Sequence, residues 1–377
     1  MSDNKSVKKE IKKIFSASLP LIIGSVCGLF VANYVYSYSG TMFDLAVLII
    51  GVYAALLMQI IIHEAGHLVF GLISGYGFSS FRIFSFTVMK ANGKLKIRRM
   101  KVPGTAGQCI MIPPDFTDGK IPVLLYNFGG SLMNLIFAVI FIVLYFALSG
   151  MPSLLMLVFG AVGFMSAFLN GFPLRMGMVN NDGVNALEVV RDAEAMHSFW
   201  VQLKVVEQTA KGVRIKDMPC EWFVLPDDDS MKKSMTTVKS VLVCNRLMDS
   251  MEFERAGETI RHLLGIESGM VELHRRALIS ELIFIDIISG KSKNDIDGLL
   301  DNKQKNFMKK MKNNPSVMRT EYFYALICEK NNKKAESIKK RFNKVCKIYP
   351  YGSETELERE LMSEEFINSL TQTHGVE

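Results

Sequence analysis

The sequence predicts a mainly α-helical membrane protein with about four transmembrane helices, a loop that contains a β-hairpin, and an all-helical, repeat-like cytoplasmic domain. Hydrophobic residues make up 49% of the 377 residues and charged residues only 21%, which is more apolar than a typical soluble protein. Residues 1–183 hold 14 basic and 7 acidic side chains, whereas residues 184–377 hold 30 of each. The positive charge therefore belongs to the apolar half, which indicates membrane topology rather than nucleic-acid binding.

Four apolar runs predict membrane spans at about 15–38, 44–73, 121–148 and 152–170, because about 20 apolar residues are enough to cross a bilayer. The second run is uncharged from 45 to 62 and stays apolar to Ile73. The alternative is the buried core of a soluble helical protein, which four such runs in one half of the chain disfavour. The first run follows a basic stretch, so it could also be a secretory signal peptide. Its 24 uncharged residues favour a membrane anchor.

Basic residues predict the orientation of these spans, since they mark the cytoplasmic side of a membrane. Residues 1–14 carry five lysines and the loop 78–120 carries eight basic residues, whereas the links near 39–42 and 149–152 carry none. We therefore expect a multi-pass protein of the cell membrane with both termini in the cytoplasm. Residues 1–14 would be a basic N-terminus, and residues 15–183 a membrane-embedded domain.

The loop after the second span has the pattern of a small sheet. Residues 78–88 are apolar and partly alternating, Asn92-Gly93 favours a two-residue turn, and residues 94–98 alternate between polar and apolar. Residues 107–112 form another extended stretch. An edge strand here could bind an unwound substrate by strand addition. The alternative, a hairpin that only covers the membrane face, stays open.

The second half of the chain predicts helices without a further span. Residues 184–233 are expected to form a helical linker, with a hinge at 227–230, and residues 234–377 a helical domain whose 12–20-residue segments are separated by Asn, Gly or Pro. Residues 322–350 resemble a tetratricopeptide repeat, although a generic helical bundle is the alternative. Such a domain offers a groove for a cytoplasmic protein partner. The Lys-rich runs 303–312 and 330–347 are interpreted as solvated helix faces.

The second span contains the motif His63-Glu64-Ala65-Gly66-His67. Residues four apart lie on one face of a helix, so both imidazoles can reach one metal ion, and Glu64 is placed to deprotonate a metal-bound water. Ionisable residues are costly inside a membrane helix and are functional by default. Two histidines that are only hydrogen-bonded between helices are the alternative.

A catalytic zinc ion takes three protein ligands and keeps one open position, so a third ligand is needed. The best candidate is Asp182, which follows the fourth predicted span. The second and fourth spans run in the same direction, so His67 and Asp182 should arrive at the same membrane side. Asp115 and Asp118 share that side and remain rivals, and an Asn-Asp-Gly turn is an alternative role for Asp182.

These motifs resemble the site-2 protease family of intramembrane metalloproteases, peptidase family M50. His63 to His67 matches the family's HExGH motif, residues 129–134 (GGSLMN) are similar to its small-residue segment before an Asn, and Asn170 to Pro173 with Asp182-Gly183 resembles its NxxP…DG motif. The resemblance covers about 43–185. It implies zinc bound by His63, His67 and Asp182, Glu64 as general base, and Asn170 as a group that binds substrate or the oxyanion. The twelve residues from Asn170 to Asp182 exceed the family's usual spacing.

We therefore expect a zinc-dependent intramembrane endopeptidase that cleaves a membrane-anchored protein or peptide near the cytoplasmic face, with Glu64 activating a zinc-bound water. The expected partners are this substrate, the lipid bilayer and a cytoplasmic protein at the helical domain, but no nucleic acid. The alternative is a catalytically inactive membrane-anchored scaffold that recruits partners through the helical domain, although a scaffold has no need for Glu64. A metal transporter is disfavoured, because the first and third spans have too few charged residues to line a path.

Overall fold

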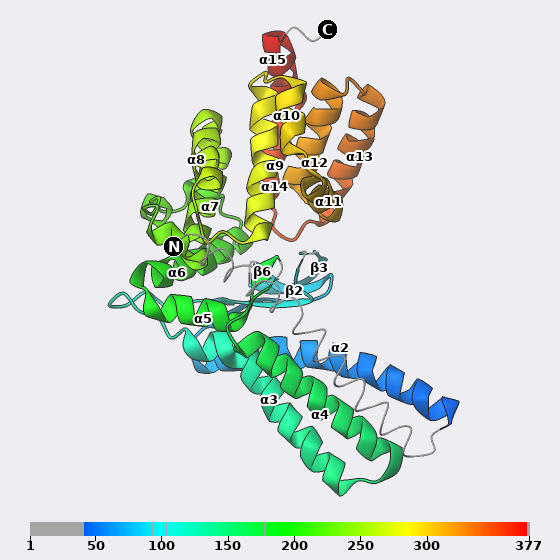
Figure 1. The fold of residues 1–377 in the computed structure, drawn as a ribbon. Helices are drawn as coiled ribbons and strands as arrows, with labels where there is room; N and C mark the ends of the chain where they lie inside the picture. The colour runs from blue at the N-terminus through cyan, green and yellow to red at the C-terminus, as the bar shows by residue number, and fades with distance from the viewer. Residues whose placement is uncertain (1–40, 92, 101, 103, 177, 375–377) are drawn as a thin grey trace, which may run out of the picture. The chain divides into compact units, whose positions relative to one another are not determined.

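Figure 1 shows the computed structural model of the chain, which describes all residues except 1–40, 92, 101, 103, 177 and 375–377. Contacts divide the chain into two compact units. The unit with the long apolar helices, here called the membrane unit, comprises the residues up to Ser74 together with Val123–Leu187. The other comprises Gly75–Pro122 together with Glu188–Glu377 and is called the cytoplasmic unit after the location that the sequence predicts for it. The predicted first span and the basic N-terminus lie outside the described residues. The predicted domain boundaries stay a prediction.

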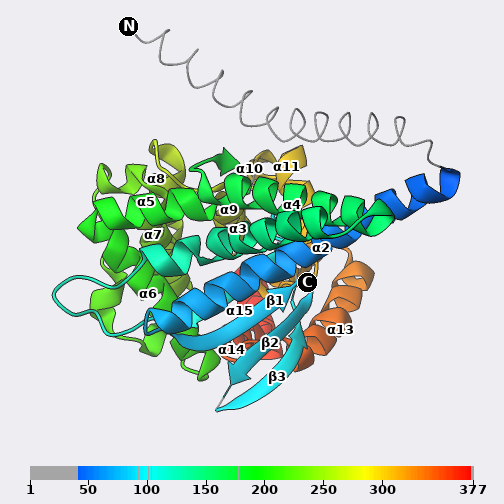
Figure 2. The same ribbon diagram turned by 90° about the horizontal axis from the view of Figure 1, so that it is seen from below.

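Three long helices form the membrane unit: α2 (Met42–Ile73), α3 (Leu124–Ala147) and α4 (Gly150–Gly171). Each is long and apolar enough to cross a membrane, as the sequence predicts for its second, third and fourth apolar runs. They lie side by side in Figure 2, where α3 and α4 form a hairpin and α2 packs against both. The start of α2 is fixed by a capping box, in which Thr41 and Asp44 each bind the other's backbone N–H.

The side chains of these helices divide into a small interior and a large exposed apolar surface. Leu48 and Ala55 of α2 pack against Leu154, Val158 and Phe159 of α4. Large apolar side chains remain exposed on the outer faces, among them Ile50 (67%), Val143 (61%) and Phe146 (79%). An apolar surface of this extent is unusual for a water-soluble protein and suits contact with lipid.

The membrane unit ends in a short irregular region that carries Asp182. Strands β5 (Arg175–Met176) and β6 (Val179–Asn180) pair with each other after α4. Helix α5 (Asp182–Arg191) begins at Asp182. The boundary between the two units lies within α5, between Leu187 and Glu188.

The loop between α2 and α3 forms a four-stranded antiparallel sheet in the order β3-β2-β1-β4. The strands are β1 (Gly77–Ile83), β2 (Phe86–Ala91), β3 (Lys94–Arg99) and β4 (Gly107–Ile112). Ala91 pairs with Lys94, which confirms the predicted hairpin. Gly93 has φ +75° in the turn, a conformation that favours glycine. Strands β3 and β4 are the two edges of the sheet.

The remaining elements of the cytoplasmic unit are helical, as predicted. The α-helices are α6 (Ala193–Ala210), α7 (Ser234–Asp249), α8 (Phe253–Gly265), α9 (Glu272–Ile288), α10 (Lys293–Leu299), α11 (Asn302–Lys310), α12 (Pro315–Phe323), α13 (Asn332–Ile348), α14 (Glu354–Leu361) and α15 (Glu364–His374). The 3-10 turns are η1 (Ile215–Asp217), η2 (Cys220–Phe223) and η3 (Ser230–Lys232), and η4 (Tyr324–Cys328) is a π-helix.

Successive helices of this unit pack against each other from α6 to α9, and α12 then packs between α9 and α13. Phe284 of α9 meets Phe323 of α12 at 5.3 Å between ring centroids, in a core where both rings are fully buried. Ala325 and Ala335 are also buried where η4 and α13 meet. The helical character of residues 234–374 is thus confirmed, whereas a repeated unit is not.

Aromatic contacts attach the sheet segment to the helices of the cytoplasmic unit. The indole N–H of Trp200 on α6 donates to the Pro114 carbonyl oxygen, at 3.0 Å. Phe116 packs against both His197 and Trp200 of the same helix, at 5.4 Å between ring centroids in each pair. These contacts give a local reason why residues 75–122 group with the C-terminal helices.

Candidate metal centre

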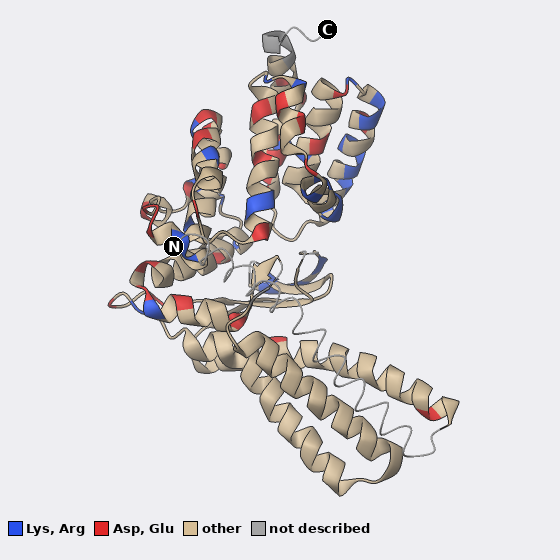
Figure 3. Ribbon diagram, viewed as in Figure 1, with Lys and Arg blue, Asp and Glu red and all other residues tan. Residues whose placement is uncertain are grey.

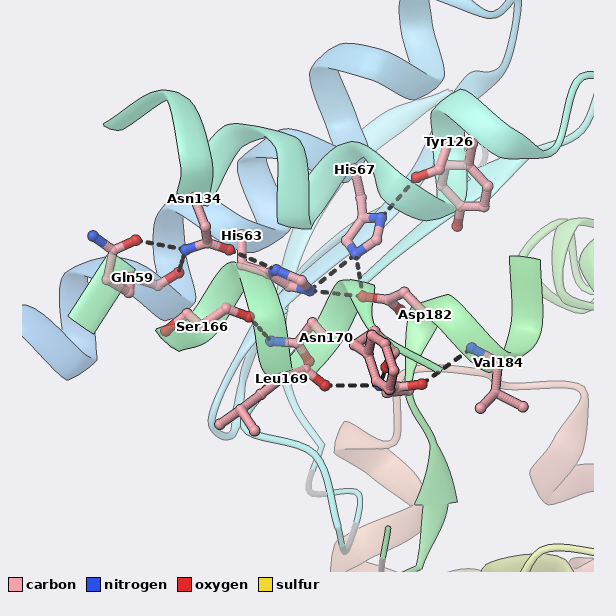
Figure 4. A network of polar contacts seen from close by, with 12 residues as sticks. Gln59, His63, His67, Tyr126, Asn134, Ser166, Leu169, Asn170, Asp182 and Val184 are labelled. Carbon is pink, nitrogen blue, oxygen red and sulfur yellow. Dashed lines mark hydrogen bonds and ion pairs between the residues drawn. The ribbon is translucent and has the colours of Figure 1, made fainter. Parts of the chain in front are cut away.

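The two histidines of α2 converge on one point. The four-residue spacing places His63 and His67 on the same helix face, and their Nε2 atoms lie 3.1 Å apart (Figure 4). Both residues are buried, with 9% and 8% of their surface exposed. Because both side chains lie inside the helix bundle, bulk water cannot satisfy the hydrogen-bonding groups of the imidazoles.

Asp182 reaches the same point from the start of α5. Its Oδ2 atom lies 3.0 Å from His63 Nε2 and 3.3 Å from His67 Nε2. Ligand atoms about 2.0–2.1 Å from a tetrahedral zinc ion are about 3.3 Å from one another. The three ligand atoms therefore form a triangle of the size that such an ion needs, and they are the one such group of His, Cys, Asp or Glu in the described part of the chain.

The hydrogen-bond partner of His67 fixes which of its nitrogens carries hydrogen. His67 Nδ1 lies 2.8 Å from the Tyr126 carbonyl oxygen. A carbonyl oxygen can only accept, so Nδ1 must donate, and in the neutral imidazole Nε2 then holds a lone pair. This lone pair points toward Asp182.

A relay of two amides fixes His63 in the same way. Asn134 on α3 donates its Nδ2 hydrogens to the backbone oxygen of Gln59, at 3.0 Å, and to Gln59 Oε1, at 2.5 Å. Its Oδ1 therefore faces His63 Nδ1, 2.8 Å away, and accepts a hydrogen bond from it. Gln59 in turn donates its Nε2 hydrogen to the Phe159 carbonyl of α4, at 3.3 Å. The backbone oxygens of Gln59 and Phe159 can only accept hydrogen bonds. They therefore fix which end of each side-chain amide is the donor.

The consequence is that three hydrogen-bond acceptors face one another. With both Nδ1 atoms donating outward, the two Nε2 lone pairs and the Asp182 carboxylate converge within about hydrogen-bond distance. Burial raises the pKa of the Asp182 carboxyl, but a proton on His67 or His63 outweighs burial and brings this pKa below its ordinary value. Such a cluster repels itself unless its members share a cation, either a proton or a metal ion.

Asp182 owes its position to the residues on either side of it. The Asn181 side chain donates to the Leu169 and Phe172 carbonyls, at 2.7 and 2.5 Å, and accepts from Val184 N–H at 3.1 Å. These bonds tie the start of α5 to the end of α4. A Cβ atom at Gly183 would lie 2.3 Å from the Gly171 carbonyl oxygen, so the close approach requires glycine.

Glycines also explain how the histidines fit between α2 and α3. A Cβ atom at Gly66 would lie 2.3 Å from the Gly129 carbonyl oxygen, so the two backbones touch there. A Cβ atom at Gly130 would lie 2.5–2.7 Å from three ring atoms of His63. Small residues commonly allow membrane helices to approach closely. In this site they also make room for the imidazole.

The other predicted site residues are placed as follows. Glu64 is buried, with 7% exposed, and follows His63 on α2. Asn170 lies on the last turn of α4, where its Nδ2 donates to the Ser166 carbonyl oxygen at 2.9 Å. Asp115 and Asp118 are exposed residues of the loop before α3 and are not members of the three-residue group.

Sequence reasoning missed Gln59, Tyr126 and Asn181 as parts of the site. A Gln one turn before His63 in an otherwise apolar helix is the one local signal that could have pointed to the relay, because i and i+4 share a helix face. Tyr126 contributes only its backbone oxygen, for which the sequence carries no signal. Comparison with known protein families, with curated proteins and with solved structures found no match for this chain.

Proposed function

We propose that the protein is a zinc-dependent intramembrane endopeptidase of the site-2 protease type. The observation that carries the proposal is the convergence of His63 Nε2, His67 Nε2 and Asp182 Oδ2 at 3.0–3.3 Å, with both imidazoles oriented by acceptors on α3. A purely structural role would require the three groups to share a proton, because three bare acceptors repel one another. Two imidazoles and a carboxylate are ligands that zinc accepts, and three protein ligands leave one position for chemistry.

In this proposal the chain's own residues divide the work. His63, His67 and Asp182 hold zinc, which when bound supplies a Lewis acid that lowers the pKa of water and polarises a carbonyl. Glu64 takes the proton from the attacking water and later delivers it to the leaving amine. Asn170 is proposed to bind the substrate backbone or the developing oxyanion, for which its carboxamide has a second N–H beside the one that donates to Ser166.

The position of the site along α2 supports a membrane-anchored substrate. His67 lies six residues before the end of α2 at Ile73, which is about 9 Å at 1.5 Å per residue. The site is thus near one end of an apolar helix rather than at its middle. With the predicted orientation, this end is cytoplasmic, and the substrate is a membrane-anchored protein or peptide cut near that face.

Strand β4 remains the proposed place for an unwound substrate. It is an edge of the sheet, and an extended peptide can add to such an edge by backbone hydrogen bonds. Replacing Ile110 or Ile112 by proline removes a backbone N–H from this strand. Slower cleavage with unchanged zinc content would support strand addition, and an unchanged cleavage rate would exclude it.

Metal analysis tests the centre directly. The detergent-purified protein is expected to contain about one zinc per chain, as one three-ligand site requires, and His67→Ala and Asp182→Ala should each lose it while keeping their helical circular dichroism. Asp118→Ala is the matched control, because it removes an exposed carboxylate outside the group. Loss of zinc with Asp118→Ala but not with Asp182→Ala would contradict the proposed ligand set. A wild-type protein that binds no zinc when supplied with it would favour the scaffold alternative.

A second experiment tests the chemistry apart from the metal. Glu64→Gln should keep zinc but lose cleavage, because an amide cannot accept the water proton. The variant is therefore a trap with which to capture membrane-anchored substrates. Retained cleavage by Glu64→Gln would remove the general-base assignment without affecting the ligand set.

A further inference from the structure

Helix α13 carries more Lys and Arg residues than any other described helix of the cytoplasmic unit. Its 17 residues contain seven Lys or Arg and one acidic residue, Glu336. The buried side consists of Ala335, Ile338, Phe342 and Cys346, which pack this helix against the rest of the unit. The opposite side faces away from α12 in Figure 3, where the basic residues of α13 are drawn in blue.

Four lysines form a straight ridge on that opposite side. At 100° per residue, Lys333, Lys340, Lys344 and Lys347 fall within about 60° of one another, and Phe342 lies about 180° away. All four are exposed. Lys347 follows Lys333 by 14 positions, so the ridge is about 21 Å long at 1.5 Å per residue.

The charges of this ridge are not compensated, unlike those beside it. Lys334 pairs with Glu329 at 2.7 Å, and Arg341 pairs with Glu321 at 3.0 Å. In the part of the chain that the structure describes, none of the four ridge lysines makes an ion pair. The unit gathers acidic residues elsewhere, with six Glu against one Arg in residues 354–365. Residues 184–377, which carry no net charge, thus present a ridge of one sign, which gives this part of the chain a directional field.

Helix α11 shows that lysine content alone does not produce such a ridge. It carries Lys303, Lys305, Lys309 and Lys310 within nine residues. At 100° per residue, Lys305 and Lys309 point well away from Lys303 and Lys310. These lysines therefore flank the buried side of α11 instead of forming one face.

We propose that the lysine ridge of α13 docks onto the anionic headgroups of the membrane that holds α2, α3 and α4. The chain is continuous from the apolar helix α4 through α5 and α6 into the helical domain, so the ridge is kept at high effective concentration near a bilayer surface. The predicted orientation puts it beside the cytoplasmic leaflet, which is anionic and attracts clustered lysines. This replaces the interpretation of residues 330–347 as a merely solvated face. It does not depend on the proposed protease activity.

Lysine acetylation in lipid nanodiscs tests the docking with the full-length protein. A water-soluble acetylating reagent is applied in nanodiscs of phosphatidylcholine, with or without one-third phosphatidylglycerol by composition, and each lysine is quantified by mass spectrometry. Acetylation of the ridge lysines is expected to be roughly threefold or more slower in the anionic nanodiscs. The protection should vanish near 0.5 M salt, because the Debye length is then only about 4 Å. Lys303, Lys309 and Lys310 of α11 are the internal control and should not change.

Charge reversal gives the decisive variant. Lys340→Glu with Lys344→Glu should abolish the protection of Lys333 and Lys347, whereas the matched pair Lys303→Glu with Lys309→Glu should leave it intact. Equal acetylation in neutral and anionic nanodiscs would overturn the proposal, as would equal protection of α11 and α13. Protection that appears only when polyglutamate is added to neutral nanodiscs would replace the bilayer by an acidic protein partner. Circular dichroism of each variant excludes unfolding as the cause.

Discussion

The two units of the molecule bury polar groups in opposite ways. In the cytoplasmic unit, the fully buried Arg319 pairs with Glu281 and with Glu358, and its guanidinium also lies 4.0 Å from the ring centre of Phe284. In the membrane unit, two imidazole nitrogens and a carboxylate oxygen face one another, and their hydrogen-bond donors all point outward to α3. The first cluster contains its own cation, the Arg319 guanidinium, whereas the second needs a cation from outside.

This difference separates structural from functional burial of polar groups. A buried ion pair with matched partners fixes how helices pack and binds nothing further. In the membrane unit, the Nδ1–H donors of the imidazoles are already bound to acceptors on α3, so the remaining acceptors favour binding of a cation. The surrounding amides and glycines maintain this geometry. We therefore expect a substitution of a buried polar residue to lower folding stability in the cytoplasmic unit. In the membrane unit, we expect it to weaken metal binding.

The largest expected effect comes from removing the cation of the Arg319 cluster. Arg319→Met leaves Glu281 and Glu358 buried without their cation, which should lower the free energy of unfolding of the cytoplasmic unit by about 3–5 kcal/mol. Both tryptophans, Trp200 and Trp222, lie in this unit, so urea titration followed by tryptophan fluorescence measures it selectively. Zinc content should not change.

Arg341→Met is the matched control for this measurement. Arg341 is 41% exposed and pairs with Glu321, and exposed pairs contribute at most about 1 kcal/mol. Equal destabilisation by the two substitutions would show that burial of the Arg319 cluster does not decide its contribution. Loss of zinc with Arg319→Met at low urea would contradict the separation of the two units.

The next effect breaks the acceptor cluster without touching a ligand. Gly130→Ala places a methyl group 2.5–2.7 Å from ring atoms of His63, so the imidazole must move. We expect zinc affinity to fall about 100-fold, the upper range for changes next to a metal ligand. Competition with a fluorescent zinc chelator measures this change.

Gly51→Ala is the control for the glycine substitution, because its Cβ atom would meet only the flexible end of Leu155. It tests whether a methyl group added anywhere between the packed helices weakens zinc binding. Comparable zinc loss in both variants would mean that helix packing in general, and not the space beside His63, controls the metal centre.

A smaller effect is expected from the amide relay. Asn134→Leu removes the acceptor of His63 Nδ1–H, so zinc affinity should fall about 10- to 100-fold. Gln59→Leu removes one of the two acceptors of Asn134 Nδ2 and keeps the Gln59 backbone oxygen, so its effect should lie at the lower end of that range. Nitrogen-15 NMR of the histidine rings provides a readout that a purely structural role would not move, because loss of Asn134 frees His63 to adopt the other tautomer.

Asn127→Leu is the matched control on the same helix. Asn127 is buried and donates to the Val123 carbonyl oxygen at 2.8 Å. The ring nitrogens of His63 and His67 instead contact each other and Asn134, Tyr126 and Asp182. It should leave both zinc affinity and the histidine tautomers unchanged. An unaltered His63 tautomer in Asn134→Leu would remove the relay from the description of the site.

The contrast also explains which features could be predicted from the sequence. The length of the apolar runs identifies α2, α3 and α4, and Asn92-Gly93 identifies the hairpin. The spacing of His63 and His67 places them on one helix face. Each of these signals is a local property of the chain. Asp182 could be proposed from the direction of the spans. The relay through Gln59 and the anchoring of Asp182 by Asn181 could not, since their partners are backbone carbonyls brought close only by packing of three helices.

The sequence also does not predict that the sheet groups with the C-terminal helices. Weakening this contact gives the smallest expected effect on stability. Trp200→Phe removes the hydrogen bond to Pro114 but keeps a ring beside Phe116, so the cytoplasmic unit should lose about 0.5–1.5 kcal/mol of unfolding free energy. Trp222 remains as the fluorescent reporter.

Trp222→Phe is the control, because it keeps the Trp200–Pro114 bond and removes only the edge contact between the two indoles at 5.5 Å. Zinc affinity should stay constant in both variants. A fall in zinc affinity with Trp200→Phe alone would show that the loop before α3 passes strain to Tyr126, whose carbonyl orients His67, and the two units would then have to be treated as coupled.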